Sequence, residues 1–193
     1  MRSSSIRKAI DIIKEGGLIV FPTDTVYGIG CNPFDEKAVE RLFQVKKRDK
    51  DKPIPILVSS RKKAEEIAEF GNFAKKIARQ HWPGALTLVL PAKANVPPML
   101  RGRGDSVGIR IPNHPLALLL IRATGGYLTG TSANLSGKKP ACTSEEAKKQ
   151  LGGKVDMILD GGRCAIGVSS TVAEVTSNRP RILRQGTVKL KIE

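Results

Sequence analysis

The chain has 193 residues, a length typical of one domain that can bury a normal core. Its 33 lysines and arginines outnumber 18 aspartates and glutamates, so the net charge is +15. With 40% hydrophobic residues and no apolar run near the ~20 residues that cross a bilayer, the sequence excludes a disordered chain and a membrane-spanning helix. The excess charge favours anionic partners, and nucleic acids, nucleotide phosphates and an anionic membrane surface all stay open at this point.

Helical and strand patterns alternate in the first half of the chain. In order, these are a helix that Ser4 or Ser5 caps and Gly16-Gly17 ends, a buried strand at 18–21, a helix from Asp35 through Phe43, a strand at 54–58, and helices at 60–69 and 72–81. Pro53 and Pro55 place the strand at 54–58 at a sheet edge or in an extended segment.

The same alternation continues in the second half. In order, the patterns predict a strand at 86–90, a surface loop at 91–106, a strand at 107–111, a helix over 116–122, a helix from the capping box at Thr143 to Gly152, strands at 155–159, 170–175 and 181–183, and a weak edge strand at 188–192. Interleaved strands and helices predict an α/β (α+β) fold with helices layered on a sheet. Some connections are too short for helical crossovers, so we expect a mixed sheet, with 1–193 as a single domain.

Polar, glycine-containing segments follow several of the predicted strands. They are 22–30, 129–137 and 160–162. Ligands of open α/β sheets bind at such strand ends, and hydroxyls with free backbone N–H groups suit phosphate or carboxylate oxygens. One such segment is consistent with an ordinary turn, whereas three together indicate a site for an anion.

Cationic side chains stand out at three places: the run from Lys46 to Lys52, Arg110 and Arg184. The run is consistent with a solvated face or with side chains that point into a cleft. Arg110 lies between two isoleucines in a predicted strand, so it needs an anionic partner. That partner is either an internal carboxylate or a ligand, and both alternatives stay open.

Other kinds of site find no support in the sequence. There is no G-x-x-x-x-G-K-[ST] P-loop and no nucleophile–base order. His81 and His114 lie at predicted helix ends, where capping is the expected role of His114, and two histidines make a zinc site unexpected. The three cysteines are widely spaced, which predicts reduced thiols in a cytosolic protein.

An ordered set of motifs runs through the chain from about Ile6 to Gly186. The motifs are PTDTVYG at 22–28, K-x-R at 46–48, WPGALT at 82–87, RIPNHP at 110–115, SANLSG at 132–137, DGG at 160–162, SSTV at 169–172 and LRQG at 183–186. Together they resemble the YrdC family of threonylcarbamoyl-adenylate synthases, in the short form without an extra C-terminal domain.

The resemblance implies a YrdC-like twisted mixed β-sheet, flanked by helices, around a large basic cavity. It implies that L-threonine, bicarbonate and ATP, with Mg²⁺ carried by the ATP, become threonylcarbamoyl-adenylate and pyrophosphate. Partner proteins would then move the threonylcarbamoyl group to tRNA in the cytoplasm. The residues implied to contact threonine are Thr23, Arg110 and Ser170. The residues implied to contact ATP are Lys46, Arg48, Lys52, Ser132, Asn134 and Arg184.

The implied reaction agrees with the charge of the chain. A carbamate oxygen must attack the α-phosphorus of ATP, and both reactants are anionic. Cationic side chains and Mg²⁺ offset that repulsion and stabilise the pyrophosphate leaving group, while the rest of the barrier falls through orientation. We therefore expect no dedicated nucleophile.

Two positions depart from the family pattern, and a second function stays open. Asp49 stands where family members often have proline, and Leu57 stands near the place of a histidine in longer members. The second departure, Leu57, puts one threonine contact in doubt. The alternative function is a non-catalytic protein on the same fold that binds tRNA or double-stranded RNA through its positive charge.

Overall fold

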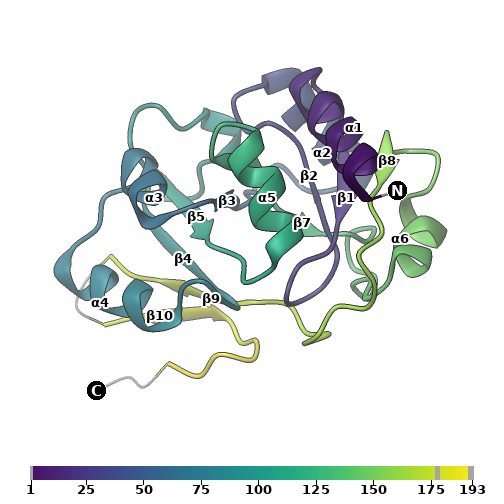
Figure 1. The fold of residues 1–193 in the computed structure, drawn as a ribbon. Helices are drawn as coiled ribbons and strands as arrows, with labels where there is room; N and C mark the ends of the chain where they lie inside the picture. Colours follow the sequence, from purple (N-terminus) through teal and green to yellow (C-terminus); the bar gives the residue numbers. More distant parts are fainter. Residues whose placement is uncertain (1, 177–178, 191–193) are drawn as a thin grey trace.

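The computed structural model describes residues 2–176 and 179–190, in which helices flank two β-sheets (Figure 1). The helices are α1 (Arg2–Lys14), α2 (Glu36–Lys46), α3 (Arg61–Ile67), α4 (Asn72–His81), the short 3₁₀ helix η1 (Pro98–Leu100), α5 (Pro115–Ala123) and α6 (Ser144–Leu151). The strands are β1 (Ile19–Phe21), β2 (Gly28–Gly30), β3 (Ile56–Val58), β4 (Leu86–Pro91), β5 (Ser106–Arg110), β6 (Tyr127–Thr129), β7 (Thr131–Ser132), β8 (Met157–Ile158), β9 (Thr171–Glu174) and β10 (Arg181–Arg184).

Both sheets are mixed, as the short connections predict. The four-stranded sheet has the order β7-β2-β1-β8, and only the β1–β8 pair is parallel. The six-stranded sheet has the order β10-β9-β4-β5-β3-β6, in which β4–β9 and β3–β5 are parallel and the other pairs antiparallel. The sequence predicts a single sheet, and the division into two is a finding of the structure.

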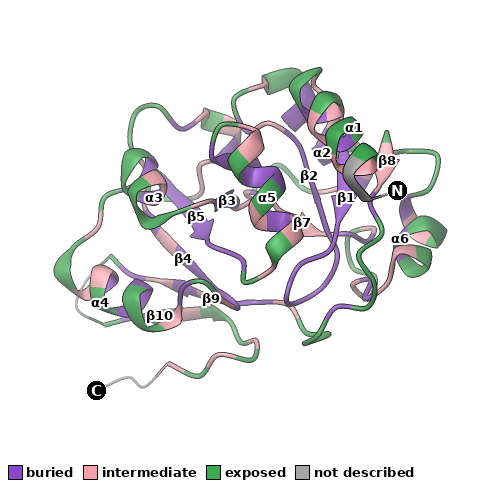
Figure 2. Cartoon of the chain, viewed as in Figure 1, coloured by how far each residue is buried: buried purple, intermediate pink, exposed green. Residues whose placement is uncertain are grey.

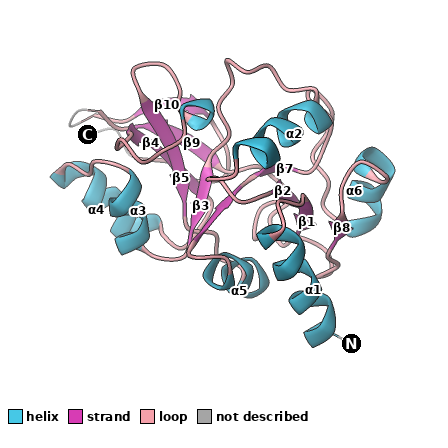
Figure 3. Ribbon diagram, turned by 90° about the horizontal axis from the view of Figure 1, so that it is seen from above, coloured by secondary structure: helices cyan, strands magenta, loops and turns pink. Residues whose placement is uncertain are grey.

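Helices pack on both sheets, and the central strands are buried, whereas β7 and β8 are half-buried and β10 is largely exposed (Figures 2 and 3). α3 contacts β3, α4 contacts β4, α5 contacts β3 and β6, and α1 lies on β1 and against α5. Two apolar clusters result, and β3 contributes to both: Ile56 joins the larger cluster, while Leu57 joins the smaller one beneath α1 and α5. A strand covered on both faces must be apolar throughout, as this one is.

The two sheets meet where β6 passes into β7. Gly130 separates these strands, so one continuous segment ends the six-stranded sheet and begins an edge of the four-stranded sheet. The Thr129 hydroxyl accepts a hydrogen bond from Cys31 N at 2.8 Å and donates to Cys31 O at 3.1 Å. A Cβ atom at Gly30 would lie 1.9 Å from Thr129 O, so only glycine allows this approach.

Most predicted elements are confirmed, and three predictions on helix and strand ends need correction. Ser4 and Ser5 do not cap α1, because the helix begins at Arg2 and both serines lie inside its first turns. The spacing of apolar residues starts at Ile6 and therefore does not predict these polar first turns. β3 is not an edge strand, because the prolines lie before it and β5 and β6 flank it. Residues 188–190 form no strand, and the rest of that predicted strand, 191–192, lies outside the described residues.

His114 caps α5, as predicted. Its Nδ1 accepts a hydrogen bond from Ala117 N at 3.5 Å. Asp35 and Thr143 cap α2 and α6 in the same way, through their side-chain oxygens. In residues 2–176 and 179–190, no helix combines the length and the apolar character needed to cross a membrane.

The junction of the sheets gives a prediction for stability. Thr129→Val keeps the shape of the side chain but leaves the buried Cys31 N without its side-chain acceptor, so we expect the free energy of unfolding to fall by ~1–3 kcal/mol. Urea denaturation followed by circular dichroism measures it. Thr187→Val, at an exposed position, is the control and should change stability by less than ~0.5 kcal/mol. Equal stabilities of the two variants would contradict the role of the Thr129 hydroxyl.

Candidate active site

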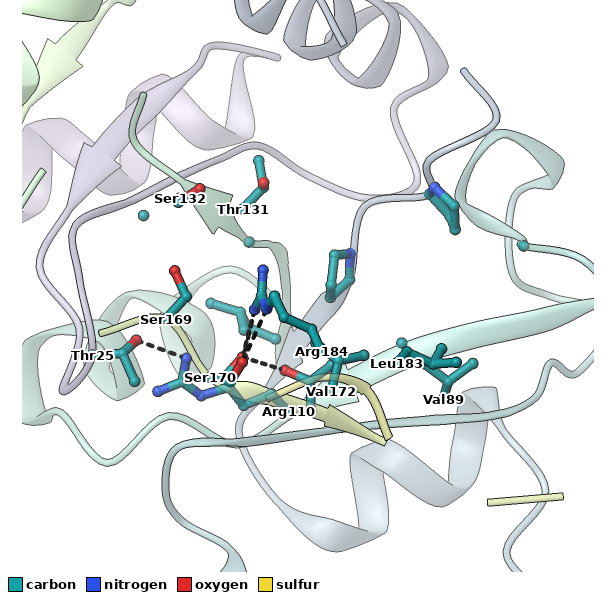
Figure 4. Close-up of a pocket in the computed structure, with 18 of the residues that line it drawn as sticks. Thr25, Val89, Arg110, Thr131, Ser132, Ser169, Ser170, Val172, Leu183 and Arg184 are labelled. Carbon is teal, nitrogen blue, oxygen red and sulfur yellow. Dashed lines mark hydrogen bonds between the residues drawn. The ribbon is translucent and has the colours of Figure 1, made fainter. Parts of the chain in front are cut away.

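A cavity of about 420 Å³ is lined by residues of both sheets (Figure 4). Its floor is one face of the six-stranded sheet, and its walls come from the segment that follows β1, from β7 and from the loop before β3. The polar segments at 22–30 and 129–137, which the sequence singles out, therefore meet at one place. The segment at 160–162 does not line the cavity, but Gly161 N donates to the Tyr27 hydroxyl behind it.

The register of the strands sets the floor of the cavity. Leu57 of β3 lies beside Arg110 of β5, and the β4–β5 register sets Thr87 next to Arg110 on the other side. Thr87 pairs with Val172, which pairs in turn with Arg184 of β10. Side chains at such matched positions share one face of a sheet, so two arginines project from a single row. The next row contains, in sheet order, Gly108, Val89, Glu174 and Arg181.

Arg110 is buried and held from three directions. Its Nη2 donates to Asp24 Oδ1 at 2.6 Å, its Nη1 to Thr25 Oγ1 at 2.9 Å, and its Nε to Gly84 O at 2.8 Å. Burial lowers the pKa of Arg110, and the charge of Asp24 opposes that shift. Of the two alternatives left open by the sequence, the structure shows the internal carboxylate; Arg110 also lines the cavity, and a ligand as a further partner stays a prediction.

Hydroxyl groups surround the guanidinium groups. Arg184 donates through Nη2 to Ser170 O at 2.9 Å and to Ser170 Oγ at 3.3 Å. The Ser170 hydroxyl lies 2.9 Å from that of Thr87, and the Thr23 hydroxyl donates to Val26 O at 2.6 Å. These groups can exchange their present partners for the oxygens of a ligand.

Three guanidinium groups face the same space. Arg48 donates to Lys52 O at 2.7 Å and to Pro53 O at 3.2 Å, which fixes the loop before β3 along the cavity. Burial, and then repulsion from Arg184, lowers the pKa of Arg48; burial, and then repulsion from Arg110, lowers that of Arg184. An anionic ligand would relieve this repulsion, so the arrangement favours a polyanion.

Lys46 lies behind the cavity and does not line it. Its Nζ donates to Ser132 O and, at 2.8 Å, to Asn134 O, so the buried ammonium braces the chain after β7. Asn134 Nδ2 donates to Leu135 O and Lys138 O, whereas its Oδ1 is buried without a partner among the described residues. Burial, and then repulsion from Arg48, lowers the pKa of Lys46 to about 7.

The structure brings together six of the nine residues implied by the family resemblance. Those that line the cavity are Thr23, Arg48, Arg110, Ser132, Ser170 and Arg184. Lys46 and Asn134 are buried beside Ser132, and Lys52 is exposed and offers only its backbone carbonyl to Arg48. Their roles toward ligands stay predictions. Sequence reasoning missed Thr25, Thr87 and Glu174 as individual site residues. Thr25 lies in the loop between β1 and β2, whereas the signal of Thr87 and Glu174 is alternation within β4 and β9, which becomes readable only once the register is known.

No metal site accompanies the cavity. In the part of the chain that the structure describes, no three His, Cys, Asp or Glu side chains come close enough to hold a metal ion. All three cysteines are free and buried. The guanidinium and hydroxyl groups that line the cavity can bind and orient anions.

Comparison with known proteins points to one family. A family model described as telomere recombination, that of the Sua5, YciO and YrdC proteins, matches residues 11–186. The chain is 42% identical over 187 residues to the threonylcarbamoyl-AMP synthase of Pyrococcus abyssi. This alignment covers 96% of the chain and 55% of the Pyrococcus protein. The chain is also 37% identical over 185 residues to the threonylcarbamoyl-AMP synthase of Bacillus subtilis. This alignment covers 95% of the chain and 54% of the Bacillus protein.

A solved structure gives the same result in three dimensions. Pyrococcus abyssi Sua5 complexed with L-threonine matches with a TM-score of 0.90 and 42% identity, over 94% of this chain and 54% of that chain. The chain thus spans about half the length of the curated relatives just described.

The lowered pKa of Lys46 predicts a pH-dependent stability. The folded chain loses the Lys46 proton near pH 7, whereas the unfolded chain keeps it to the ordinary value of 10.5. Between these values the unfolded state binds more protons, so a rise in pH should stabilise the folded state through this group. Below pH 7 both states are protonated, and the cost of burying the charge is complete.

Urea denaturation from pH 6 to 10 of the native protein and of Lys46→Met measures this effect. The unfolding free energy of the native protein minus that of Lys46→Met should be constant below pH 7 and should then increase as the pH rises, because the native protein becomes more stable relative to the variant. Lys50→Met, at an exposed position, should give a flat difference. A flat difference for Lys46→Met as well would show that Lys46 titrates as an exposed lysine does.

Proposed function

The chain belongs to the Sua5/YciO/YrdC family, and on that premise we propose that it is a threonylcarbamoyl-AMP synthase. It joins L-threonine, bicarbonate and ATP into threonylcarbamoyl-AMP and releases pyrophosphate. The observation that supports this most is the cavity in which Arg48, Arg110 and Arg184 converge with the hydroxyls of Thr23 and Ser170. Such a set of groups suits one amino acid and one polyphosphate held side by side.

The reaction forms two bonds. The threonine amine attacks the bicarbonate carbon, and loss of water leaves a carbamate. A carbamate oxygen then attacks the α-phosphorus of ATP, the bond to the β-phosphate oxygen breaks, and the electron pair leaves with pyrophosphate. All reacting groups are anionic when the second bond forms, so charge stabilisation and orientation are the tasks of the protein.

The cavity residues divide these tasks. Arg110, with Thr23 and Ser170 nearby, is placed to take the threonine carboxylate and side-chain hydroxyl, since a guanidinium can bind a carboxylate through two N–H groups. Arg48 and Arg184 are placed to neutralise the triphosphate and the departing pyrophosphate. Lys46 acts from behind by fixing the backbone at Ser132.

Mg²⁺ enters, in this proposal, as part of the MgATP substrate and not as a resident ion. The carboxylates that line the cavity are Asp51 and Glu174, and Glu174 is already paired with Arg181 at 2.8 Å. A metal bound to the phosphates would add to the charge stabilisation that the guanidinium groups supply.

The product and its setting follow from the same proposal. Threonylcarbamoyl-AMP is an activated acyl donor, and partner proteins would transfer the threonylcarbamoyl group to tRNA in the cytoplasm. The relatives compared above are named as synthases, so the alternative of a non-catalytic RNA-binding protein is not favoured. Direct contact with tRNA is compatible with the charge of +15 but is a separate property.

Pyrophosphate release tests the proposed activity. The protein is incubated with ATP, Mg²⁺, bicarbonate and L-threonine, and pyrophosphate is measured with a coupled enzyme. We expect release that depends on threonine and on bicarbonate, with threonylcarbamoyl-AMP as the second product by mass spectrometry. Release at the same rate without threonine would exclude the synthase and leave only a nucleotide hydrolase.

Arg48→Gln tests the role of the loop before β3. Loss of a cation that faces the transferring phosphorus should reduce kcat/KM for ATP by roughly 10²-fold and affect the KM for threonine much less. Lys50→Gln removes an exposed cation from the same loop, 3.8 Å from Glu40, and should leave the kinetics unchanged. Equal kinetics of the two variants would show that Arg48 is only a support of the loop.

A further inference from the structure

The two ends of the cavity differ in charge. At one end, Arg110 lines the cavity and forms an ion pair of 2.6 Å with Asp24, which does not itself line it; the two side chains are 7% and 9% exposed, and their charges sum to zero. At the other end lie Arg48 and Arg184. Of the two lining carboxylates, Glu174 is paired with Arg181 at 2.8 Å, and neither Asp51 nor any other carboxylate of the described residues forms an ion pair with Arg48 or Arg184. The guanidinium groups without a carboxylate partner are therefore Arg48 and Arg184, and Arg184 reaches Ser170, next to the balanced Arg110–Asp24 pair.

Asp24 fixes Arg110 within a small network. Its Oδ1 also accepts a hydrogen bond from Asn113 N at 3.1 Å, and its backbone oxygen accepts one from Ile166 N at 3.0 Å. Asp24, Thr25 and Gly84 each accept one hydrogen bond from Arg110, so three of its five N–H groups are used. Two N–H groups are left, which is the number that a bidentate carboxylate takes.

We propose that Asp24 is a positioning residue that also sets ligand choice at its end of the cavity. Its carboxylate keeps this end near zero net charge, so the end accepts a zwitterionic amino acid and rejects phosphate groups. The proposal rests on the proposed function, because it concerns how the same site separates its two substrates.

The physical basis is the charge that each ligand brings. An amino acid carries one carboxylate and one ammonium, so the Arg110–Asp24 pair can offer it hydrogen bonds without an unbalanced charge. Pyrophosphate and ATP are multiply charged, and a buried carboxylate nearby repels them strongly at low dielectric constant. Without Asp24, unpaired guanidinium groups would line the whole cavity, and a polyphosphate could occupy the amino acid end and block it.

Isothermal titration calorimetry with L-threonine and with inorganic pyrophosphate as probes tests this proposal. For Asp24→Asn we expect threonine to bind at least tenfold more weakly (~1.4 kcal/mol at 25 °C) and pyrophosphate to bind at least about threefold more tightly. For Asp24→Glu, which keeps the charge but displaces it, threonine should bind more weakly and pyrophosphate as in the native protein. Asp11→Asn, an exposed change on α1, is the matched control and should alter neither affinity.

Opposite shifts of the two ligands are the deciding result. If Asp24 were only structural, Asp24→Asn would lower the affinities for threonine and for pyrophosphate together. That outcome would overturn the proposal, and so would an unchanged affinity for pyrophosphate. Should Asp24→Asn fail to fold by circular dichroism, a change of pyrophosphate affinity in folded Asp24→Glu would overturn it instead. If the native protein bound no threonine, the proposed function would be wrong, while the pyrophosphate titrations would still test the charge balance.

Discussion

One register across the six-stranded sheet determines where the cationic groups of the cavity lie. β5 pairs with β3 and β4, and β9 pairs with β4 and β10, so that Arg110 and Arg184 fall in the same row with Thr87 and Val172 between them. If the pairing slipped by one residue, the side chains of the shifted strand would project from the opposite face of the sheet, and an arginine would be buried in the apolar cluster behind it. The polar floor therefore depends on backbone pairing that the large core around Ile109 enforces.

The four-stranded sheet supplies the opposite wall, and Lys46 links it to α2. The ammonium of Lys46 is fully buried, which is costly for a charged group unless it is paired or well hydrogen-bonded. Two backbone carbonyls offset that cost and, in return, hold Ser132 where it lines the cavity. Because Lys46 is the last residue of α2, the same helix end fixes both Arg48 and the β7 wall.

Much of this arrangement was predictable from the sequence, and the rest depends on pairing between distant strands. An arginine between two isoleucines already indicates an anionic partner, and the structure identifies Asp24 as one. The glycines of β2 and the two residues of β7 give too weak a signal to predict strands, and so the second sheet was not foreseen. Lys46 follows a helical pattern that does not reveal which way its side chain turns at the helix end.

The pairing of β1 with β8 has a consequence for the synthesis of the chain. The amide of Leu18 bonds to Asp156, 138 residues later, and β4 likewise waits for β9 to cover its outer edge. A nascent chain still on the ribosome therefore keeps unpaired strand edges in both sheets until β8 and β9 emerge, and contacts so distant in sequence form slowly. The cavity is complete only after Ser170 and Arg184 have emerged, so a nascent chain that lacks them has no formed cavity.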